Sequence, residues 1–336
     1  MPYRPDRLLI ERRALDLPLT QRVIARLPHL TPEIIETPGR IPSVPRGGAR
    51  EIYIAAKRTL IVGLSPGPPL RTCRPSADYE LPLGSSCPGL CQYCYLQGSL
   101  GMRPYVRVYA DLEAIEAAVE ERLAAEPGEI SFEAASLSDP IAVEHLTGAL
   151  AEIIPFFGRL DRARLRMVTK FAYTEGLLGL PHGGRTRIRY SLNTPYVRGF
   201  EAGTDPIEER IEAANRLGRD GYPIGFVLAP LMIYPGWERD YETLISGLAE
   251  RLDPALLPGL SFELISHRFT ARAKEIIRSR FPSCRLDLDE TGRRIKWGRY
   301  GHRKFIYPAE DLQKLWSRLK EAIERHFPGA VVEYAT

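Results

Sequence analysis

Residues 85–97, Ser85-Ser-Cys-Pro-Gly-Leu-Cys-Gln-Tyr-Cys-Tyr-Leu-Gln97, hold three of the five cysteines of this chain of 336 residues. The spacing of Cys87, Cys91 and Cys94 is CxxxCxxC, and an aromatic residue, Tyr93, stands directly before the third cysteine. Three thiolates on one short loop can bind three irons of a [4Fe-4S] cube and leave the fourth iron open to another ligand. The segment therefore predicts an iron-sulfur cluster with one reactive position.

A zinc site and plain buried thiols are the alternatives for these cysteines. A zinc site would need a fourth Cys or His nearby, and no histidine occurs between Cys73 and His145. Cys73 could be that ligand, but a proline-containing segment separates it from the loop and the spacing would be unusual. The N-terminus lacks the apolar core of a signal peptide, so we expect no disulfide framework. We expect Cys284 to be a structural thiol at the start of a strand.

The composition indicates one α/β domain with extensions, because 336 residues with 44% hydrophobic content can bury a large core. No apolar run approaches the length that crosses a bilayer, so we expect a cytoplasmic protein that is not bound to a membrane. The formal net charge of +4 is too small to indicate a polyanionic partner by itself.

Strands and helices alternate along the chain. Two strands are expected before the cysteine loop, at 51–55 and 59–62, and the segment 111–125 is expected to be a helix with Asp111 as its N-cap. Alternating elements imply right-handed crossovers and a parallel sheet, here curled into a barrel or partial barrel. The remaining expected elements are strands at 129–134, 165–169, 186–192, 224–229 and 261–265, and helices at 141–154, which Pro155 helps to end, 207–218 and 241–251.

Polar residues follow the predicted strands, at the end where active residues of a parallel barrel lie. Each has a structural interpretation, since Ser and Asp often begin helices and a lysine can extend along an apolar surface. Five such strand ends in succession are more informative than any one of them. Lys170 could neutralise a carboxylate, while Ser and Asn could hold ribose hydroxyls. The residues are Glu133, Ser136, Ser138, Asp139, Thr169, Lys170, Ser191, Asn193, Ala229, Pro230 and Glu263.

A basic segment near the C-terminus, residues 285–304, contains seven Lys and Arg with Trp297 and Tyr300 between them. Alternating cations and aromatic rings suit contact with phosphates together with base stacking. A solvated pair of surface strands is the alternative, and composition alone slightly favours it.

The cysteine spacing, with an aromatic residue before the third cysteine, is similar to that of the radical S-adenosylmethionine (SAM) enzymes. In them the open iron binds SAM, and the reduced cluster cleaves it to a 5′-deoxyadenosyl radical. Over residues 50–336 the chain resembles one family of this superfamily, the spore photoproduct lyases. The motifs that carry the resemblance are CPGLCQYCYLQ (87–97), RPYVRVY (103–109), FEAASLSD (132–139), TKF (169–171), RIEAA (210–214), GYPIGF (221–226), FELISHRFT (262–270) and KWGRYG (296–301).

This resemblance implies a lyase that acts on the methylene-bridged thymine dimer formed in dehydrated, UV-irradiated DNA. It also implies a partial (β/α)6 radical SAM barrel at 81–270, an N-terminal extension at 1–80 packed on it, and a C-terminal region at 271–336 with a β-hairpin that grips the lesion. The partners expected are damaged duplex DNA and an electron donor such as flavodoxin or ferredoxin, and the protein is expected to be a monomer. Extruding a joined thymine pair costs less than flipping an intact base, because its stacking is already damaged.

The resemblance also implies roles for individual residues. Cys87, Cys91 and Cys94 would bind the cluster. For SAM, Tyr93 would pack near the adenine, Ser138 and Lys170 would hold the methionine end, and Ser191, Asn193 and Ala229 would line the nucleoside. Tyr95 would relay a hydrogen atom back to the deoxyadenosyl radical. Arg299 and Tyr300 would insert beside the flipped lesion, with Lys304 on the same hairpin.

One position departs from the family pattern. In the lyases the segment reads Phe-Glu-Ala-Ala-Cys, and that cysteine gives a hydrogen atom to the product radical, whereas here the residue is Ser136. A serine O–H bond is far stronger than a thiol S–H bond, so a hydroxyl cannot do this. Three hypotheses follow: a lyase in which Cys73, Tyr95 or an external thiol supplies the hydrogen, a radical SAM paralogue with another substrate, or a non-catalytic protein that binds damaged DNA.

Overall fold

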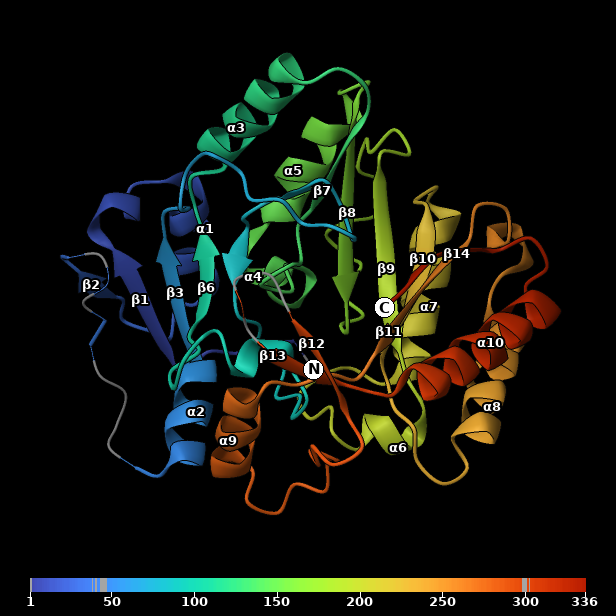
Figure 1. Ribbon diagram of the computed structural model, residues 1–336. Coiled ribbons are helices and arrows are strands. Elements are labelled where there is room, and N and C mark those ends of the chain that lie inside the picture. The colour runs from blue at the N-terminus through green and yellow to red at the C-terminus, as the bar shows by residue number, and fades with distance from the viewer. Residues whose placement is uncertain (1, 38, 40, 43–46, 298–300, 302) are drawn as a thin grey trace.

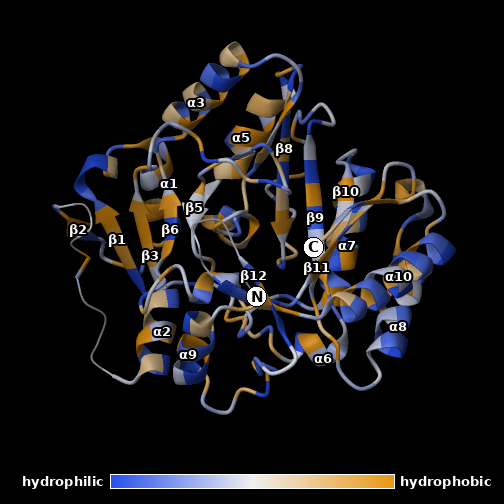
Figure 2. Ribbon diagram, viewed as in Figure 1, coloured by the Kyte–Doolittle hydropathy of each residue, from blue (hydrophilic) through white to orange (hydrophobic). Residues whose placement is uncertain are grey.

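Two β-sheets and a hairpin organise the chain in the computed structural model, which describes residues 2–37, 39, 41–42, 47–297, 301 and 303–336 (Figure 1). The larger sheet lies in the middle of the molecule, with helices packed along its outer side (Figure 1). Hydrophobic residues are concentrated on the strands and on the inward sides of the helices (Figure 2). The two sheets share one large apolar core, which includes Leu8, Val62, Phe132 and Phe226.

The larger sheet has seven parallel strands, in the order β14-β11-β10-β9-β8-β7-β4. It curls into a partial barrel, as the alternation of strands and helices predicts. The strands are β14 (Val331–Ala335), β11 (Ser261–Ser266), β10 (Ile224–Leu231), β9 (Thr186–Leu192), β8 (Ala163–Thr169), β7 (Ile130–Glu133) and β4 (Tyr79–Glu80). The connecting helices include α3 (Leu112–Ala125), α7 (Ile207–Arg219), α8 (Trp237–Arg251) and α10 (Ala309–His326).

The smaller sheet has the order β2-β1-β3-β6-β5, and only β5 is antiparallel to its neighbour. Its strands are β2 (Glu33–Ile35), β1 (Arg7–Glu11), β3 (Thr59–Gly63), β6 (Val106–Tyr109) and β5 (Gly84–Ser85). Strands from either side of residue 80 thus belong to one sheet, and β14 belongs to the barrel sheet although it lies after residue 270. The division of the chain into domains at residues 80 and 270 remains a prediction. Each sheet takes strands from more than one of the three predicted parts.

The prediction of a strand at 51–55 is wrong, because these residues lie in the helix α2 (Ala49–Lys57). A short apolar run does not distinguish a strand from a buried helix by its pattern. The Glu51 carboxylate accepts a hydrogen bond from Gly48 N at 2.8 Å, which ties the first turn, and Tyr53 and Ala56 face the interior three positions apart. The strand expected at 59–62 is confirmed as β3.

The single helix expected at 141–154 is also wrong. The segment forms the 3-10 turn η3 (Ile141–Val143), α4 (Glu144–Thr147) and α5 (Ala149–Gly158), with a bend of 105° between the last two helices. Gly148 has φ +62° at the bend, and Glu144 accepts hydrogen bonds from Leu150 N at 2.9 Å and Ala151 N at 3.0 Å. These bonds satisfy free N–H groups at the start of α5, which then continues past Pro155.

Two smaller predictions are corrected as well. Asp111 stands at the N-cap position of α3, but its carboxylate accepts from Ser65 N at 2.8 Å and Ser65 Oγ at 2.7 Å rather than from the helix. Cys284 lies in a loop after α9 (Ala271–Arg280), not at a strand start, and packs at the edge of a second apolar cluster with Phe281.

Within the described residues, no single helix is both long and apolar enough to cross a bilayer. The bent pair Ile141–Thr147 and Ala149–Gly158 passes that test only by length and composition, and most of its apolar side chains are buried in the core.

The predicted C-terminal hairpin is present as β12 (Arg294–Trp297) and β13 (Arg303–Ile306), which pair antiparallel. It lies near the centre of the view in front of the two sheets (Figure 1). Arg299 and Tyr300, predicted to contact the lesion, lie outside the described residues.

Candidate radical SAM site

The cysteine loop runs from β5 to the 3-10 turn η2 (Tyr95–Gln97) and is bound by hydrogen bonds to the segment after β9. Leu90 N donates to Ala202 O at 2.8 Å, and Gln92 N donates to Phe200 O at 2.9 Å. On its other side, Lys57 Nζ donates to Cys87 O at 2.7 Å. The loop is therefore held on both sides before any cofactor binds.

The three thiols of this loop lie around one space. A Cβ atom placed on Gly89 would be 3.5 Å from Cys87 Sγ and 3.8 Å from Cys91 Sγ, so Gly89 lies against both sulfurs. Burial, opposed by the Lys57 ammonium, raises the pKa of Cys87 to about 11, and burial together with Glu201 raises the pKa of Cys91 further. Cys94 lies close enough to both to raise these pKa values.

Among the described residues, no three His, Cys, Asp or Glu side chains converge on a single metal ion. That geometry does not match the zinc alternative, in which four ligands surround one ion. A [4Fe-4S] cube instead binds each cysteine to a different iron, so its ligands are spread around a larger space. The loop residues fit a cluster better than a zinc ion.

Lys170, directly after β8, is at the centre of the polar residues beside this loop. Its Nζ donates to Ser191 Oγ and, at 3.4 Å, to Ala229 O, and lies 5.8 Å from the centre of the Tyr93 ring. The structure thus brings together four residues that the sequence predicts for SAM binding: Tyr93, Lys170, Ser191 and Ala229. They come from the cysteine loop and from three neighbouring strand ends.

Glu201 is the residue of this group that the sequence reasoning missed. It is fully buried, accepts a hydrogen bond from the Tyr93 hydroxyl, and lies 3.3 Å from Lys170 Nζ and 3.0 Å from Arg210 Nη2. Burial opposes ionisation, but the charges of Lys170 and Arg210 lower its pKa overall. No pattern pointed to it, because Glu201 lies in a loop beyond a strand end, although its partner Arg210 is in a quoted motif.

Asn193 reaches the same region, but its side chain is occupied by structural hydrogen bonds. Its Nδ2 donates to Pro230 O at 2.9 Å, and its Oδ1 accepts from Thr194 N at 3.0 Å and from Tyr241 Oη at 3.2 Å. These bonds fix the end of β9 beside β10. Lining the nucleoside remains a prediction for Asn193.

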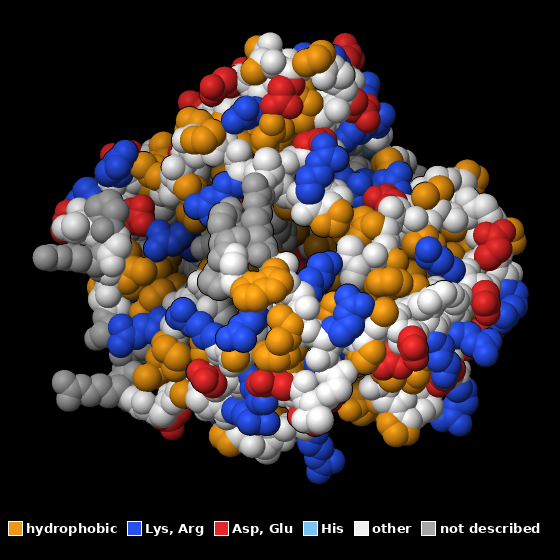
Figure 3. Space-filling view, in the orientation of Figure 1, with side chains coloured by type: hydrophobic (Ala, Val, Ile, Leu, Met, Phe, Trp, Pro, Cys, Tyr) orange, Lys and Arg blue, Asp and Glu red, His pale blue; other side chains and the backbone are white. Residues whose placement is uncertain are grey.

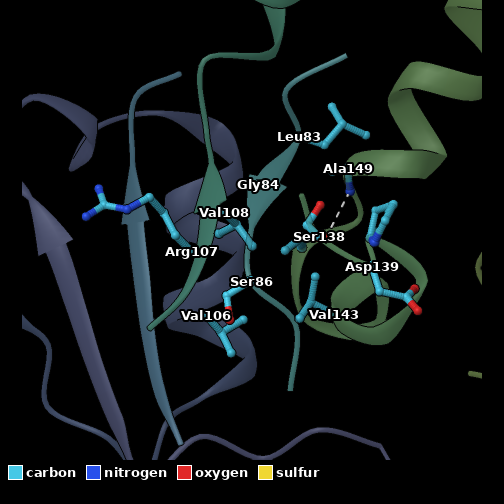
Figure 4. Close-up of a pocket in the computed structure, with 12 residues that line it drawn as sticks. Leu83, Gly84, Ser86, Val106, Arg107, Val108, Ser138, Asp139, Val143 and Ala149 are labelled. Carbon is cyan, nitrogen blue, oxygen red and sulfur yellow. Dashed lines mark hydrogen bonds between the residues drawn. The ribbon is translucent and has the colours of Figure 1, made fainter. Parts of the chain in front are cut away.

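Ser138 lies beside the start of the cysteine loop. It forms a β-bridge with Ser86 and borders the small cavity of Figure 4, which lies between β5, β6 and the helices α4 and α5 and has room for about one water molecule. The next residue, Asp139, accepts hydrogen bonds from Thr169 Oγ1 at 2.9 Å and Lys170 N at 3.0 Å. Its pKa is raised to about 6 by burial, against these hydrogen bonds. The structure therefore joins Asp139, rather than Ser138, to the Lys170 backbone.

Tyr95 and Ser136 meet on the other side of the cysteine loop. The Tyr95 hydroxyl donates to Ser136 O, while 65% of the Tyr95 surface is exposed. Ser136 Oγ is buried and has no hydrogen-bond partner among the described residues. Tyr95, the predicted hydrogen relay, therefore contacts the residue that stands where the family has its donor cysteine.

Two of the polar strand ends serve the barrel interior instead of a ligand. Glu133 and Glu263 are both paired with the buried Arg189, and Glu263 also pairs with Arg166 at 2.6 Å. Tyr334 Oη donates to Glu263 Oε2 at 2.5 Å. Both carboxylates are already paired with these partners. A position at a strand end therefore does not by itself identify a residue that binds a ligand.

The two described strands of the hairpin carry positive charge. Lys304 on β13 faces Lys296 on β12, and burial together with Arg268 and Lys296 lowers the pKa of Lys304. No described carboxylate forms an ion pair with either lysine. Figure 3 shows Lys and Arg side chains around a hollow at the centre of this face. Like charges opposite each other on paired strands are unfavourable unless an anion lies near them.

A family model described as spore photoproduct lyase matches residues 3–336. The spore photoproduct lyase of Bacillus subtilis (strain 168) is 39% identical over 339 aligned residues, which cover 100% of this chain and 99% of the relative, and that of Clostridium acetobutylicum is 35% identical over 98% of both chains. A solved spore photoproduct lyase variant with bound AdoMet and dinucleoside spore photoproduct is 40% identical and superposes with a TM-score of 0.97, covering 100% of both chains. This chain belongs to the spore photoproduct lyase family, whose members are radical SAM lyases.

Proposed function

We propose that this chain cleaves SAM reductively at a [4Fe-4S] cluster and uses the resulting radical to reverse the methylene-bridged thymine dimer in DNA. The observation that carries the proposal is the contact between the cysteine loop and the Lys170–Glu201 group. Backbone hydrogen bonds join the loop to residues 200–202, and the Tyr93 hydroxyl donates to Glu201. An ammonium thus lies beside the cysteine loop, near Tyr93 and Cys91, where an anionic ligand of the open iron would need it.

Cys87, Cys91 and Cys94 would bind the cluster, which supplies the electron and the open coordination position when it is bound. Lys170 would attract the carboxylate of SAM, because a charge-assisted hydrogen bond to a carboxylate is among the stronger contacts a lysine makes. Glu201 holds Lys170 in place beforehand and is itself held by Arg210. Tyr93, Ser191, Asn193 and Ala229 would surround the adenosine, and Ser138 remains proposed for the methionine end.

The hairpin would hold the DNA. Its exposed cations Arg294, Lys296 and Arg303 and the exposed Trp297, 68% of whose surface is open, offer phosphate contacts and a ring for stacking. Arg299 and Tyr300 are proposed to contact the lesion, together with Lys304 on β13. This favours the phosphate-binding interpretation of the basic segment over an inert strand pair.

The proposal includes an external electron donor such as flavodoxin or ferredoxin, a cytoplasmic location and a monomeric protein. Similarity over the full length of the lyases supports this function over the two alternatives, a paralogue with another substrate and a non-catalytic protein that binds damaged DNA. A cluster kept only for structure would not need the ammonium of Lys170 beside it.

The test is anaerobic incubation of the reconstituted protein with SAM, dithionite and dinucleoside spore photoproduct, with products separated by mass. We expect 5′-deoxyadenosine and repaired thymine, released as the two thymidines of the dinucleoside. Replacing Cys91 by Ala should abolish the charge-transfer absorption of the cluster and SAM cleavage, while the matched variant Cys284→Ala should keep both. An iron-free protein that binds zinc would refute the cluster, and SAM cleavage that leaves the dimer intact would refute the substrate.

A further inference from the structure

We propose that Cys73 donates the hydrogen atom that the product radical needs, in place of the cysteine that this chain lacks at position 136. This inference rests on the proposed function and adds a catalytic residue to it. Cys73 lies outside the motifs that carry the resemblance, and the sequence left it as one of several possible donors.

The position of Cys73 follows from the way its segment is attached to the barrel. Cys73 N donates to Asp78 O at 3.0 Å and Ala77 N donates to Cys73 O at 3.2 Å, so residues 73–78 form a closed turn. The turn is fixed to β7 because Asp78 N donates to Ser131 O at 3.1 Å and Ser76 Oγ donates to Glu133 Oε2 at 2.5 Å. Cys73 is therefore held beside the strand that leads to Ser136.

The Cys73 thiol lies beside Ser136, the position at which the family has its donor cysteine. The Ser136 hydroxyl has no hydrogen-bond partner among the described residues. Both this hydroxyl and the Glu80 carboxylate lie close enough to the Cys73 thiol to change its pKa. Tyr95, which contacts Ser136 O, is also within electrostatic range of Cys73. Cys73, Ser136 and Tyr95 thus form one group, with a thiol supplied from a different segment of the chain.

The environment keeps the thiol protonated. Burial, together with the Glu133 and Glu80 carboxylates, raises the pKa of Cys73 to about 12, against the influence of Arg189. A hydrogen-atom donor must carry its hydrogen, and at neutral pH a thiol of this pKa is almost entirely S–H. Cys73 is only partly buried, so the residue is not sealed inside the core.

The proposed step balances without an added oxidant or reductant. After the methylene bridge breaks, the carbon radical on the freed thymine takes the hydrogen atom of Cys73, which forms a C–H bond, breaks the S–H bond and leaves a thiyl radical. Tyr95 then gives its O–H hydrogen to that sulfur and becomes a tyrosyl radical. Hydrogen return from 5′-deoxyadenosine to Tyr95 closes the cycle, so the unpaired electron ends where it began.

The first test compares Cys73→Ser with Cys284→Ser in the turnover assay. We expect Cys73→Ser to keep reductive SAM cleavage but to lose clean thymine formation and to give adducts of dithionite-derived species, with Cys284→Ser unchanged. Adding Ser136→Cys to Cys73→Ser should restore clean thymine. Clean thymine from Cys73→Ser itself would overturn the proposal and leave the proposed function intact.

A second test needs neither cluster nor turnover. The infrared S–H stretching band of Cys73, assigned as the band lost in Cys73→Ser, should shift when dinucleoside spore photoproduct binds to the protein, and the band of Cys284 should not. A Cys73 band that does not move at a saturating concentration would place the thiol away from the substrate and overturn the proposal. If the parent protein and the Cys73→Ser/Ser136→Cys variant both cleave SAM but neither cleaves the dimer, the proposed function fails.

Discussion

Two buried charge groups in the same barrel differ in how completely their charges are paired. In the Arg189 group, Arg189 lies between Glu133 and Glu263, and the three side chains are 1%, 3% and 2% exposed. In the Lys170 group, Lys170 and Arg210 face Glu201, but the Lys170 side chain is 18% exposed. The first group is closed, whereas the second presents a cation to the space beside the cysteines.

The chemistry of the two cations explains this difference. A guanidinium has five donors in a fixed plane and can bind two carboxylates at once, so Arg189 stays locked between its partners. An ammonium on a flexible chain can exchange one partner for another, and Lys170 contacts a hydroxyl, a carbonyl and a carboxylate, any of which a ligand can replace. Burial of charge alone therefore does not identify the site. An open side on a buried cation does.

The largest effect should come from breaking the closed group. Replacing Arg189 by Met leaves Glu133 and Glu263 buried with too little positive charge, and breaking such a pair typically costs about 3–5 kcal/mol. Chemical denaturation should show this loss. The matched control is Arg164→Met, because Arg164 pairs with Glu129 at 2.8 Å on the surface, where such a pair is worth about 1 kcal/mol or less. If Arg189→Met and Arg164→Met lowered the free energy of unfolding equally, burial would not distinguish the Arg189 ion pairs from the surface pair of Arg164 and Glu129.

Glu144 extends the comparison, because it is a buried carboxylate that forms no ion pair within the described part of the chain. Burial raises the pKa of Glu144 from 4.5 to about 7, although it accepts hydrogen bonds from Leu150 N and Ala151 N. Because the folded-state pKa is the higher one, ionised Glu144 costs stability. The cost is absent below about pH 4.5 and complete above about pH 7, where it reaches about 3 kcal/mol.

Glu144→Gln removes this titration. The unfolding free energy of the parent protein, relative to that of Glu144→Gln, should therefore fall as the pH rises between these two values. Urea denaturation at several pH values measures the difference. A constant difference across this range would show that Glu144 is not titrating there, and Glu113→Gln on the exposed side of α3 is a control that should show no such trend.

The smallest of the three effects should be on ligand binding. Removing Lys170 leaves Glu201 still paired with Arg210, so Lys170→Met should cost less stability than Arg189→Met. It should weaken SAM binding by about 1.5–3 kcal/mol, the range for a hydrogen bond to a charged group. Titration of the reconstituted protein checks this. Lys314→Met, which removes a surface lysine, should leave SAM binding unchanged, and unchanged binding for Lys170→Met would remove Lys170 from the site.

Much of this protein could be predicted from local sequence patterns. The CxxxCxxC loop specifies the chemistry by spacing alone, because three thiolates within eight residues must share one small space. The alternation of apolar strands with helices after residue 110 determined the parallel barrel sheet, and the strand-end position brought Lys170, Ser191 and Ala229 together. Local patterns failed at residues 51–55, where a short apolar run fits a strand and a buried helix equally, and at the bend before α5, where Glu144 binds the first N–H groups of the new helix.

Only the tertiary structure decided which polar residues are free to act. Glu133 and Lys170 look alike as strand-end charges, yet Arg189 closes around the first and the second stays open beside the cysteines. Glu201 and Cys73 follow no periodic pattern, and each gains its place from hydrogen bonds to a distant segment. The physical reason is that partners close in space but distant in sequence fix the charge and the reach of a side chain.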